Sequence, residues 1–280
     1  MKIAHVILTH TSPEQLDRLV RKLQYEDAHF YIHVDLKQDI VPYKALLNSA
    51  DVRFVENRMK VYWGGYSIVQ ATINSFTELF NSGVQYDYIN CLSGQDYPIK
   101  STAYIHQYLK DNPRKVFMHS LSIEQEWTEA LPRIRKYHLV NYNFPGKYKV
   151  EKLINMLLPE RKFPASLEPV GRSQWFTIPP ECAKYVVDYL EKNKDVRNFF
   201  KLTWAPDEMI FQTILYQSQY RKDMVNNNLL YVDWSEGKPH PKVLRMEDAD
   251  RIKNSAKLFA RKFDIKVDSG ILDYIDSITQ

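Results

Sequence analysis

Two adjacent carboxylates stand directly behind a proline in the stretch Trp204-Ala-Pro-Asp-Glu208, which an apolar run at residues 209–215 follows. The proline predicts the first turn of a helix, where a side chain can project from the helix end into a cleft. A carboxylate held there can act as a general base that takes a proton from a hydroxyl group. Asp207 lies about 100° around such a helix from Glu208. We therefore expect Asp207 to cap or brace the helix and Glu208 to be the base; the alternative is that both only complement the helix dipole.

The bulk composition narrows the class of protein. A chain of 280 residues that is 44% hydrophobic and 13% aromatic predicts one folded domain with a substantial core. The formal charge is only +4 and no block of like charges occurs, so nucleic acid is not an expected partner. Cys91 and Cys182 lack the spacing of a disulfide framework or a zinc site and are expected to be reduced core residues. No apolar run reaches membrane length, so we expect a cytoplasmic location, with peripheral attachment at the inner face of the membrane left open.

The elements that must position these carboxylates alternate between strand and helix. Strands are predicted at residues 2–8, 30–35, 51–56 and 86–93, and helices at 41–49 and 67–80, with a further helix opened by Ser12 as N-cap, Pro13 as first residue and Gln15 as a capping-box partner. This alternation predicts an α/β fold with a mostly parallel, doubly wound central sheet and helices on both faces. Such sheets bind ligands at the carboxyl ends of their strands, where Asp35 and Asp96 fall.

The second half of the chain is less regular at first. Residues 116–165 read as an irregular flap with one helix near 150–158, and order returns with strands at 174–178 and 229–234. Helices are expected at 101–109, at 180–193 and, as the terminal element, at 250–263. We find no linker or internal repeat and predict a single domain over 1–280.

The eight glycines exclude several enzyme classes. None of their spacings forms a Gly-x-Gly-x-x-Gly turn or a Walker loop, and the chain contains no Gly-x-Ser-x-Gly or His-Glu-x-x-His. Dinucleotide oxidoreductases, P-loop enzymes, serine hydrolases and zinc peptidases are therefore disfavoured. Sugar-nucleotide transferases remain as a major class on an α/β sheet; a methyltransferase is a third possibility, against which the missing glycine-rich first turn argues.

Six collinear segments together resemble the core-2/I-branching β-1,6-N-acetylglucosaminyltransferase family, which also contains peptide O-xylosyltransferases. The segments are Phe30-Tyr-Ile-His-Val-Asp35, Tyr88-Ile-Asn-Cys-Leu-Ser-Gly-Gln-Asp-Tyr-Pro98, Gly171-Arg-Ser-Gln-Trp175, Ala205-Pro-Asp-Glu208, His240-Pro241 and Leu258-Phe-Ala-Arg-Lys-Phe-Asp264. The resemblance implies a GT-A-like fold, a UDP-sugar donor, inversion at the anomeric carbon and no requirement for a divalent metal. It divides the domain into a nucleotide-sugar-binding half (1–115), the flap (116–165) and an acceptor and catalytic half (166–280).

The resemblance also assigns roles to individual residues. Glu208 matches the family's general base, and Asp96 matches the position near the donor sugar where other GT-A enzymes carry a metal-binding Asp-x-Asp. Asp35 matches the residue that meets the uridine, and Lys262 matches a lysine that binds the diphosphate.

Further site residues follow less directly. The family's second diphosphate cation aligns with either Lys242 or Arg245. Trp234 falls near an aromatic residue that meets the acceptor sugar, and Trp175 and Trp63 are further candidates because C–H groups of sugars pack on aromatic rings.

We expect no metal ligands and no cofactor. The one literal Asp-x-Asp, Asp248-Ala-Asp250, precedes a predicted helix, so capping is its expected role. Two cations about 4 Å from phosphate oxygens each contribute roughly 4 kcal/mol at an effective dielectric near 20. Their summed contribution is comparable to the stabilisation that one metal ion supplies.

The sequence thus predicts an inverting, metal-independent, β-1,6-N-acetylglucosaminyltransferase-like enzyme. It would move N-acetylglucosamine or xylose from a UDP-sugar to a hydroxyl of a glycan or lipid-linked glycan acceptor. Because the animal members carry a membrane anchor and disulfides that are not found in this sequence, a bacterial-type member in cell-surface polysaccharide synthesis is expected. The alternative is a non-catalytic nucleotide-sugar-binding protein with a degenerate transferase site.

Overall fold

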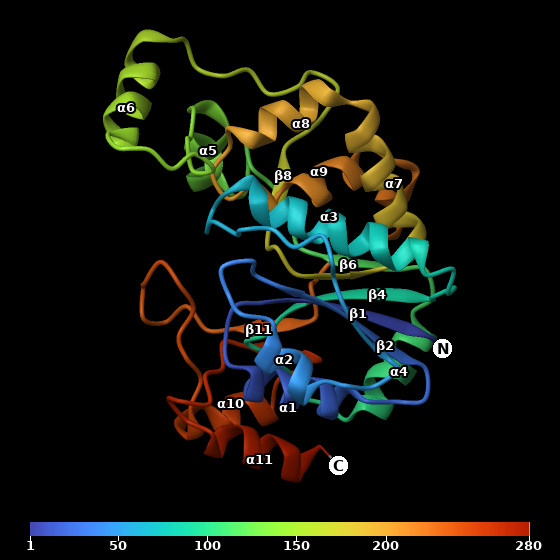
Figure 1. The fold of residues 1–280 in the computed structure, drawn as a ribbon. Coiled ribbons are helices and arrows are strands. Elements are labelled where there is room, and N and C mark those ends of the chain that lie inside the picture. Colours follow the sequence, from blue (N-terminus) through green and yellow to red (C-terminus); the bar gives the residue numbers. More distant parts are fainter. Residues whose placement is uncertain (280) are drawn as a thin grey trace.

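A seven-stranded sheet with the order β10-β6-β9-β4-β1-β2-β3 forms the centre of the computed structural model, which describes residues 1–279 (Figure 1). Its strands are β1 (Ile3–Thr9), β2 (Ala28–Val34), β3 (Val52–Phe54), β4 (Tyr88–Ser93), β6 (Val116–Met118), β9 (Phe176–Ile178) and β10 (Met224–Asn226). Neighbouring strands are parallel, except that β9 runs antiparallel to both β4 and β6. The predicted mostly parallel sheet is confirmed.

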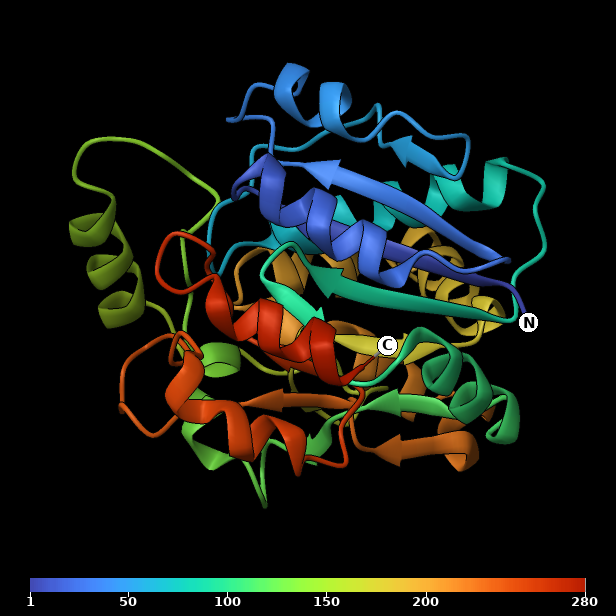
Figure 2. The ribbon, with the colours of Figure 1, turned by 90° about the horizontal axis from the view of Figure 1, so that it is seen from below.

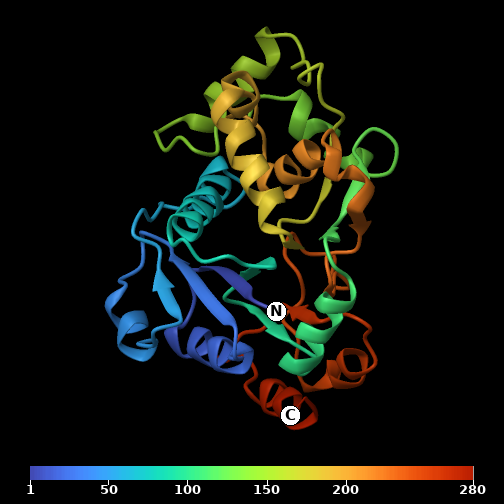
Figure 3. The ribbon, with the colours of Figure 1, turned by 90° about the vertical axis from the view of Figure 1, so that its right-hand side faces the viewer.

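Helices cover both faces of this sheet (Figures 1 and 3). One face carries α1 (Pro13–Leu23), α2 (Val41–Leu46), α4 (Thr102–Asp111), α10 (Ala249–Lys253) and α11 (Gly270–Ile278); the other carries α3 (Tyr66–Asn81), α7 (Pro180–Lys192), α8 (Lys194–Lys201) and α9 (Ile210–Tyr216). Each face has its own apolar core because side chains alternate along a strand: Ile3 and Ile7 of β1 enter one core, and Ala4 and Val6 enter the other. The predicted α/β fold class, with helices on both faces of a mostly parallel sheet, is confirmed.

Two small sheets bring distant parts of the chain together. The first has the order β11-β12-β5, formed by β11 (Leu230–Val232), β12 (Phe259–Arg261) and β5 (Asp96–Pro98), and the second pairs β7 (Ser120–Ser122) with β8 (Val170–Arg172). In the antiparallel β12–β5 pair, Arg261 lies opposite Asp96. The C-terminal part of the chain therefore reaches the turn that follows β4.

The prediction of a helix over residues 250–263 is correct only for its first residues and wrong for the rest. Only α10 forms, and it ends at Lys253; the segment Phe259–Arg261 is instead strand β12, and the terminal helix is α11. The apolar run at Leu258–Ala260 fits a helix or a buried strand equally well. Pairing with β11 and β5 decides for the strand.

The helix predicted to begin with the Pro-Asp-Glu turn is interrupted. Pro206–Glu208 forms a separate 3-10 helix, η2, and α9 begins only at Ile210. Ala205 adopts a left-handed backbone with φ of 49°, and its N–H donates to the carbonyl of Gly64 at 2.7 Å. This tertiary bond fixes the turn independently of the helix that follows.

Residues 116–165 are more ordered than the expected flap. They contain β6 of the central sheet, β7, the 3-10 helix η1 (Thr128–Ala130), α5 (Leu131–Arg135) and α6 (Lys147–Leu157), the last of which confirms the helix expected near 150–158. Outside this region, two further 3-10 helices are η3 (Gln219–Asp223) and η4 (Met246–Asp248). No helix within residues 1–279 has both the length and the apolar character needed to cross a bilayer.

Gln15 does not form the predicted capping box, although Ser12 does cap α1. The buried amide nitrogen of Gln15 donates to the carbonyls of Gly94 and Phe263, each at 3.0 Å, and its oxygen accepts from the N–H of Ile265 at 3.0 Å. A buried side-chain amide whose nitrogen and oxygen are both hydrogen-bonded stabilises the contact between the segments that it joins. Gln15 therefore joins the turn after β4 to the segment after β12.

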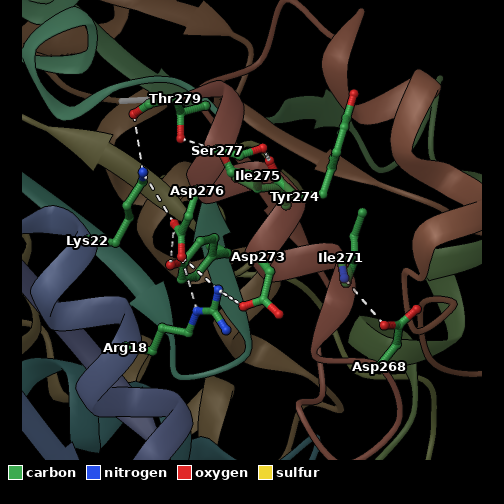
Figure 4. Close-up of polar contacts among 11 residues, drawn as sticks. Arg18, Lys22, Asp268, Ile271, Asp273, Tyr274, Ile275, Asp276, Ser277 and Thr279 are labelled. Atoms are coloured by element: carbon green, nitrogen blue, oxygen red, sulfur yellow. Dashed lines mark hydrogen bonds and ion pairs between the residues drawn. The ribbon is translucent and has the colours of Figure 1, made fainter.

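The C-terminal helix α11 is clamped onto α1 by charged side chains (Figure 4). Arg18 donates to Asp273 and Asp276, each at 2.7 Å, and Lys22 lies 3.2 Å from Asp276. The hydroxyl of Tyr97 donates to the same Asp276 carboxylate at 2.9 Å. The clamp holds α11 beside β5.

Candidate active site

Asp35 is a buried acceptor at the carboxyl end of β2, as the sequence predicts. One carboxylate oxygen accepts from the backbone N–H of Lys37 at 2.9 Å, and the ammonium of Lys37 lies 3.3 Å from the other. The guanidinium of Arg58 donates to the backbone carbonyl of Asp35 at 3.0 Å. These contacts fix the side chain and compensate its charge in a place where water is largely excluded.

Asp96 begins β5 and forms a buried ion pair with Arg261. One oxygen accepts from the N–H of Ser93 at 2.8 Å, and the other lies 3.1 Å from the Arg261 guanidinium without hydrogen-bonding geometry. Burial raises the pKa of Asp96 to about 6, against the opposing effect of Arg261. The guanidinium also lies over the ring of Trp175, 4.8 Å from its centroid. Both Asp96 and Arg261 thus retain a hydrogen-bonding atom without a partner.

Lys262 follows β12 beside the segment that carries the other predicted cations. Its carbonyl accepts from the N–H of Leu244 at 2.8 Å, so residues 242–245 run alongside it. The ammonium of Lys242 is bound by Asp248 and Glu247, each at 2.8 Å. Within residues 1–279, no carboxylate lies within ion-pair distance of Lys262.

Asp248 does not cap the helix that follows it, contrary to the prediction, but closes the preceding 3-10 turn η4. Asp248 accepts from the N–H of Arg245 at 3.0 Å at the start of η4, and its second oxygen binds Lys242. The Arg245 side chain is exposed. No group of three His, Cys, Asp or Glu side chains within residues 1–279 is arranged to hold a metal ion.

His10 was not predicted as a site residue, yet it lies within electrostatic range of both Asp35 and Lys262. It lies in the loop between β1 and α1 and is exposed to solvent. The other charged groups within electrostatic range are Lys37 and Arg261. Partial desolvation lowers its pKa most, Asp35 opposes this, and the three cations add to the lowering. The residues predicted to meet the uridine and the diphosphate therefore lie on the same side of the sheet.

Glu208, the predicted base, is held by an arginine that sequence reasoning missed. The guanidinium of Arg133, on α5, lies 2.5 Å from one Glu208 oxygen. The same guanidinium lies over the rings of Trp127 and Trp204, at 4.7 and 4.4 Å from their centroids. Glu208 is about a third exposed, so the carboxylate is oriented by protein contacts and still reachable from solvent.

Asp207 is buried and does not cap a helix as predicted. The N-cap positions of η2 and α9 carry no side-chain cap, and one carboxyl oxygen of Asp207 has no hydrogen-bond partner. Burial, and secondly the neighbouring Glu208, raises the pKa of Asp207 to about 8. The raised pKa favours the protonated carboxyl at neutral pH, and of the two roles expected for Asp207, capping is wrong.

One segment connects Glu208 to the Asp96–Arg261 pair. A Cβ atom on Gly171, in β8, would lie 2.8 Å from Cα of Met209 and closer still to the carbonyl of Glu208, so only glycine allows this approach. Trp175, which stacks on Arg261, is four residues further along the same segment. Four residues span at most about 14 Å. Glu208 and the Asp96–Arg261 pair thus flank the segment 171–175.

A second segment connects the base to Asp35. The ammonium of Lys37 donates to the carbonyl of Val61 at 2.6 Å, and two residues later Trp63 packs edge-on against Trp204 with centroids 5.3 Å apart. Gly64 then accepts the Ala205 bond. The two segments place the predicted donor-side residues and Glu208 around one edge of the central sheet.

The predicted acceptor aromatics differ in their surroundings. Trp175 is partly buried against Arg261, whereas Trp234, just after β11, is 54% exposed and Trp63 is 67% exposed. No contact ties Trp234 to Glu208, so its role stays a prediction.

Comparison with known proteins identifies the family. Residues 3–254 match the family model described as Core-2/I-Branching enzyme. Xylosyltransferase 2 of Rattus norvegicus is 26% identical over 99% of this chain and 33% of its own length, and Xylosyltransferase of Ciona intestinalis is 24% identical over 99% and 34%. The chain thus spans about a third of the length of these curated relatives. The crystal structure of mouse Xyloside xylosyltransferase 1, apo form, is 10% identical with a TM-score of 0.42, covering 93% of this chain and 97% of that chain. Since the family model matches most of the sequence, this chain belongs to the Core-2/I-Branching enzyme family.

Proposed function

We propose that the protein is an inverting glycosyltransferase that moves N-acetylglucosamine or xylose from a UDP-sugar to a hydroxyl of a glycan acceptor without a divalent metal. The observation that supports this most is the arrangement of Glu208, held by Arg133, beside a segment whose far end contacts the Asp96–Arg261 pair. This chemistry needs a base for the acceptor and cations for the leaving group, and the position of Glu208 and Arg261 on either side of segment 171–175 supports the proposal.

The reaction would proceed in one displacement. Glu208 takes the proton of the acceptor hydroxyl as that oxygen forms a bond to the anomeric carbon, and the bond between this carbon and the UDP oxygen breaks. Attack from the face opposite UDP inverts the anomeric configuration. The Arg133 contact leaves one Glu208 oxygen available to the hydroxyl.

Cations would stabilise the charge that develops on the diphosphate. Lys262 lies within electrostatic range of His10, as does Asp35, and it has no carboxylate partner within residues 1–279, so its ammonium is available to an anion. Lys242 is already bound by two carboxylates, which favours Arg245 as the second cation. Each cation about 4 Å from a phosphate oxygen contributes roughly 4 kcal/mol before desolvation.

The remaining predicted residues would position the donor and the acceptor. Asp35 is a fixed buried acceptor suited to the uridine. Asp96 has one oxygen that lies beside Arg261 without a hydrogen bond, and it is suited to hydroxyls of the donor sugar. Trp234 remains available as a platform for the acceptor. We also propose, from the family resemblance, that the acceptor belongs to cell-surface polysaccharide synthesis in the cytoplasm.

Hydrolysis of a panel of UDP-sugars by the purified protein tests the donor class before the acceptor is known. We expect slow release of UDP from one donor, unchanged by EDTA. Loss of turnover on adding EDTA would contradict metal independence. UDP binding with no hydrolysis or transfer from any donor would instead favour the non-catalytic alternative.

Glu208→Gln tests the base. Transfer should fall by about 10² to 10⁴ because proton abstraction is lost, while UDP affinity measured by calorimetry stays unchanged. Asp207→Asn is the matched control, since Asp207 is buried and largely protonated and should retain transfer below about pH 8. Full activity of Glu208→Gln would rule out this assignment.

Lys262→Ala tests the diphosphate contact. We expect UDP to bind about tenfold or more weakly, because a charge-assisted hydrogen bond contributes roughly 1.5–3 kcal/mol. Lys266→Ala is the matched control, since Lys266 is exposed four residues away. Equal UDP affinities of the two variants would contradict the role of Lys262.

A further inference from the structure

Helix α6 stands apart from the body of the protein at the side where β1 and β2 end (Figures 1 and 2). None of its residues is buried. Tyr148, Met156 and Leu157 are 77%, 69% and 68% exposed, and Leu153 is 49% exposed. An isolated helix of this length is only marginally stable in water. Apolar side chains gathered on an exposed surface commonly mark a contact with a partner or a membrane.

The polar side of α6, not its apolar side, faces the protein. Glu151 accepts from the N–H of Leu139 at 2.7 Å. Asn155, one turn later on the same face, exchanges two hydrogen bonds of 2.8 Å with the backbone of Tyr137. These bonds fix the rotation of the helix about its axis. Its apolar residues, apart from the half-buried Ile154, are consequently held outward.

The outward face combines apolar and basic side chains. Its exposed members are Tyr148, Lys149, Val150, Lys152, Leu153, Met156 and Leu157. The one acidic residue within the helix, Glu151, is turned toward the protein. Lysines beside an aromatic residue and long aliphatic side chains are typical of a helix that lies in the interface of an anionic membrane, where the apolar groups enter the headgroup boundary and the ammonium groups stay in water.

The helix is anchored at the rim of the candidate active site. Asn141, in the loop before α6, accepts from the N–H of Ser67 at 3.1 Å and donates to the carbonyl of Lys201 at 2.9 Å. The N–H of His138 donates to the carbonyl of Leu202 at 2.9 Å. These bonds attach the loop just before the Trp204–Glu208 segment.

We propose that α6 is a membrane-binding helix that lies flat on the surface of an anionic phospholipid bilayer. Tyr148, Leu153, Met156 and Leu157 enter the headgroup boundary, and Lys149 and Lys152 meet the anionic headgroups. A second copy of the chain fits less well. Pairing two such faces would bring like lysines together, and 11 residues form a helix only about 16 Å long, too short for the roughly 800 Å² per partner of a stable interface.

Membrane binding would also orient the site that we assign to glycosyl transfer. Because the α6 loop is attached next to Trp204, a bound bilayer lies beside the edge that carries Glu208. If the proposed function is correct, the acceptor is a glycan carried by a lipid in that bilayer. The binding of α6 itself does not depend on that activity.

Co-sedimentation of the full chain with vesicles tests the proposal. We expect little binding to phosphatidylcholine vesicles, and clear, salt-sensitive binding when part of the lipid is phosphatidylglycerol. Loss of each lysine should weaken binding about fivefold, which corresponds to about 1 kcal/mol. Lys149→Glu/Lys152→Glu should therefore weaken it by about 25-fold or more.

A second variant tests the apolar contribution. Met156→Ser/Leu157→Ser should weaken binding by about tenfold or more, because both side chains leave the headgroup boundary. Its matched control is Leu46→Ser/Tyr104→Ser, since these residues are 43% and 52% exposed on α2 and α4.

The charge control reverses two exposed lysines elsewhere, Lys110→Glu/Lys192→Glu, on α4 and α7. Both controls should bind vesicles as the wild type does. The thermal unfolding of the α6 variants should be unchanged because α6 has no buried residue. Three results would overturn the proposal. In the first, the protein does not bind anionic vesicles, and in the second, the control and α6 variants lose binding equally. In the third, light scattering shows a dimer that the α6 variants abolish without any effect on lipid binding. None of these readouts uses sugar transfer, so failure here is distinguishable from failure of the proposed enzyme.

Discussion

Replacing Asp207 by Asn should change how the free energy of unfolding depends on pH. Burial raises the pKa of this carboxyl from 3.8 to about 8 in the folded protein, with a further contribution from Glu208. Between these values the folded state holds a proton that the unfolded chain releases. The contribution of Asp207 to stability is therefore greatest below about pH 4, falls as the pH rises, and levels off above about pH 8.

The expected magnitude follows from this displacement. One pKa unit corresponds to about 1.4 kcal/mol, so a displacement of this size corresponds to several kcal/mol across the window. Asn cannot ionise, and it resembles the protonated acid in shape. We expect Asp207→Asn to match the wild type near pH 4 and to exceed its stability by about 2–4 kcal/mol near pH 8.

Urea unfolding at a series of pH values measures this difference. Buried His5 and His33 titrate in the opposite sense, since burial lowers their pKa values to about 3 and about 4, and they raise stability as the pH rises. They are present in both proteins, so their effect cancels in the difference between variant and wild type. Parallel pH profiles of the two proteins would refute the burial of an unpaired Asp207 carboxyl.

Three further substitutions test the contacts around the site. Gly171→Ala should destabilise the protein by about 2 kcal/mol or more and reduce transfer, because the methyl group meets the backbone at Glu208; unchanged urea unfolding would contradict this close approach. Arg133→Lys keeps the charge near Glu208 but loses the planar stacking, so unfolding should show a loss of about 1–2 kcal/mol, and a loss below about 0.5 kcal/mol would mean that stacking contributes little. Asp276→Asn should lower the free energy of unfolding by about 1–3 kcal/mol because Lys22 loses its carboxylate partner and Arg18 keeps only Asp273, whereas an unchanged melting temperature would show that the Asp276 part of the α11 clamp is dispensable.

The first half of the fold could be predicted from the sequence because its elements are long and periodic. β1, β2, α1 and α3 carry either a buried apolar run or a helical stripe over seven or more residues. β6 and β12, of three residues each, are too short to show a period. The reversed direction of β9 is set by its partners β4 and β6, which local sequence does not encode.

The positions of proposed site residues were predictable where topology alone determines them. Asp35 and Asp96 could be found because parallel strands end at one edge of a sheet. Arg133 and Arg261 could not, since each is defined by a contact with a carboxylate far away in sequence, at Glu208 and Asp96. The burial of Asp207 was also hidden, because the helix expected at the Pro-Asp-Glu turn would have left that side chain at an exposed N-terminus.

Gln15 has a consequence for the order in which the protein assembles. Its side chain needs partners from the turn at Gly94 and from Phe263 and Ile265, which lie about 250 positions downstream. During synthesis Gln15 leaves the ribosome about 250 residues before Phe263 and Ile265 do. Contacts of such long range also slow folding. The proposed donor side of the site is therefore completed only after translation has passed Ile265.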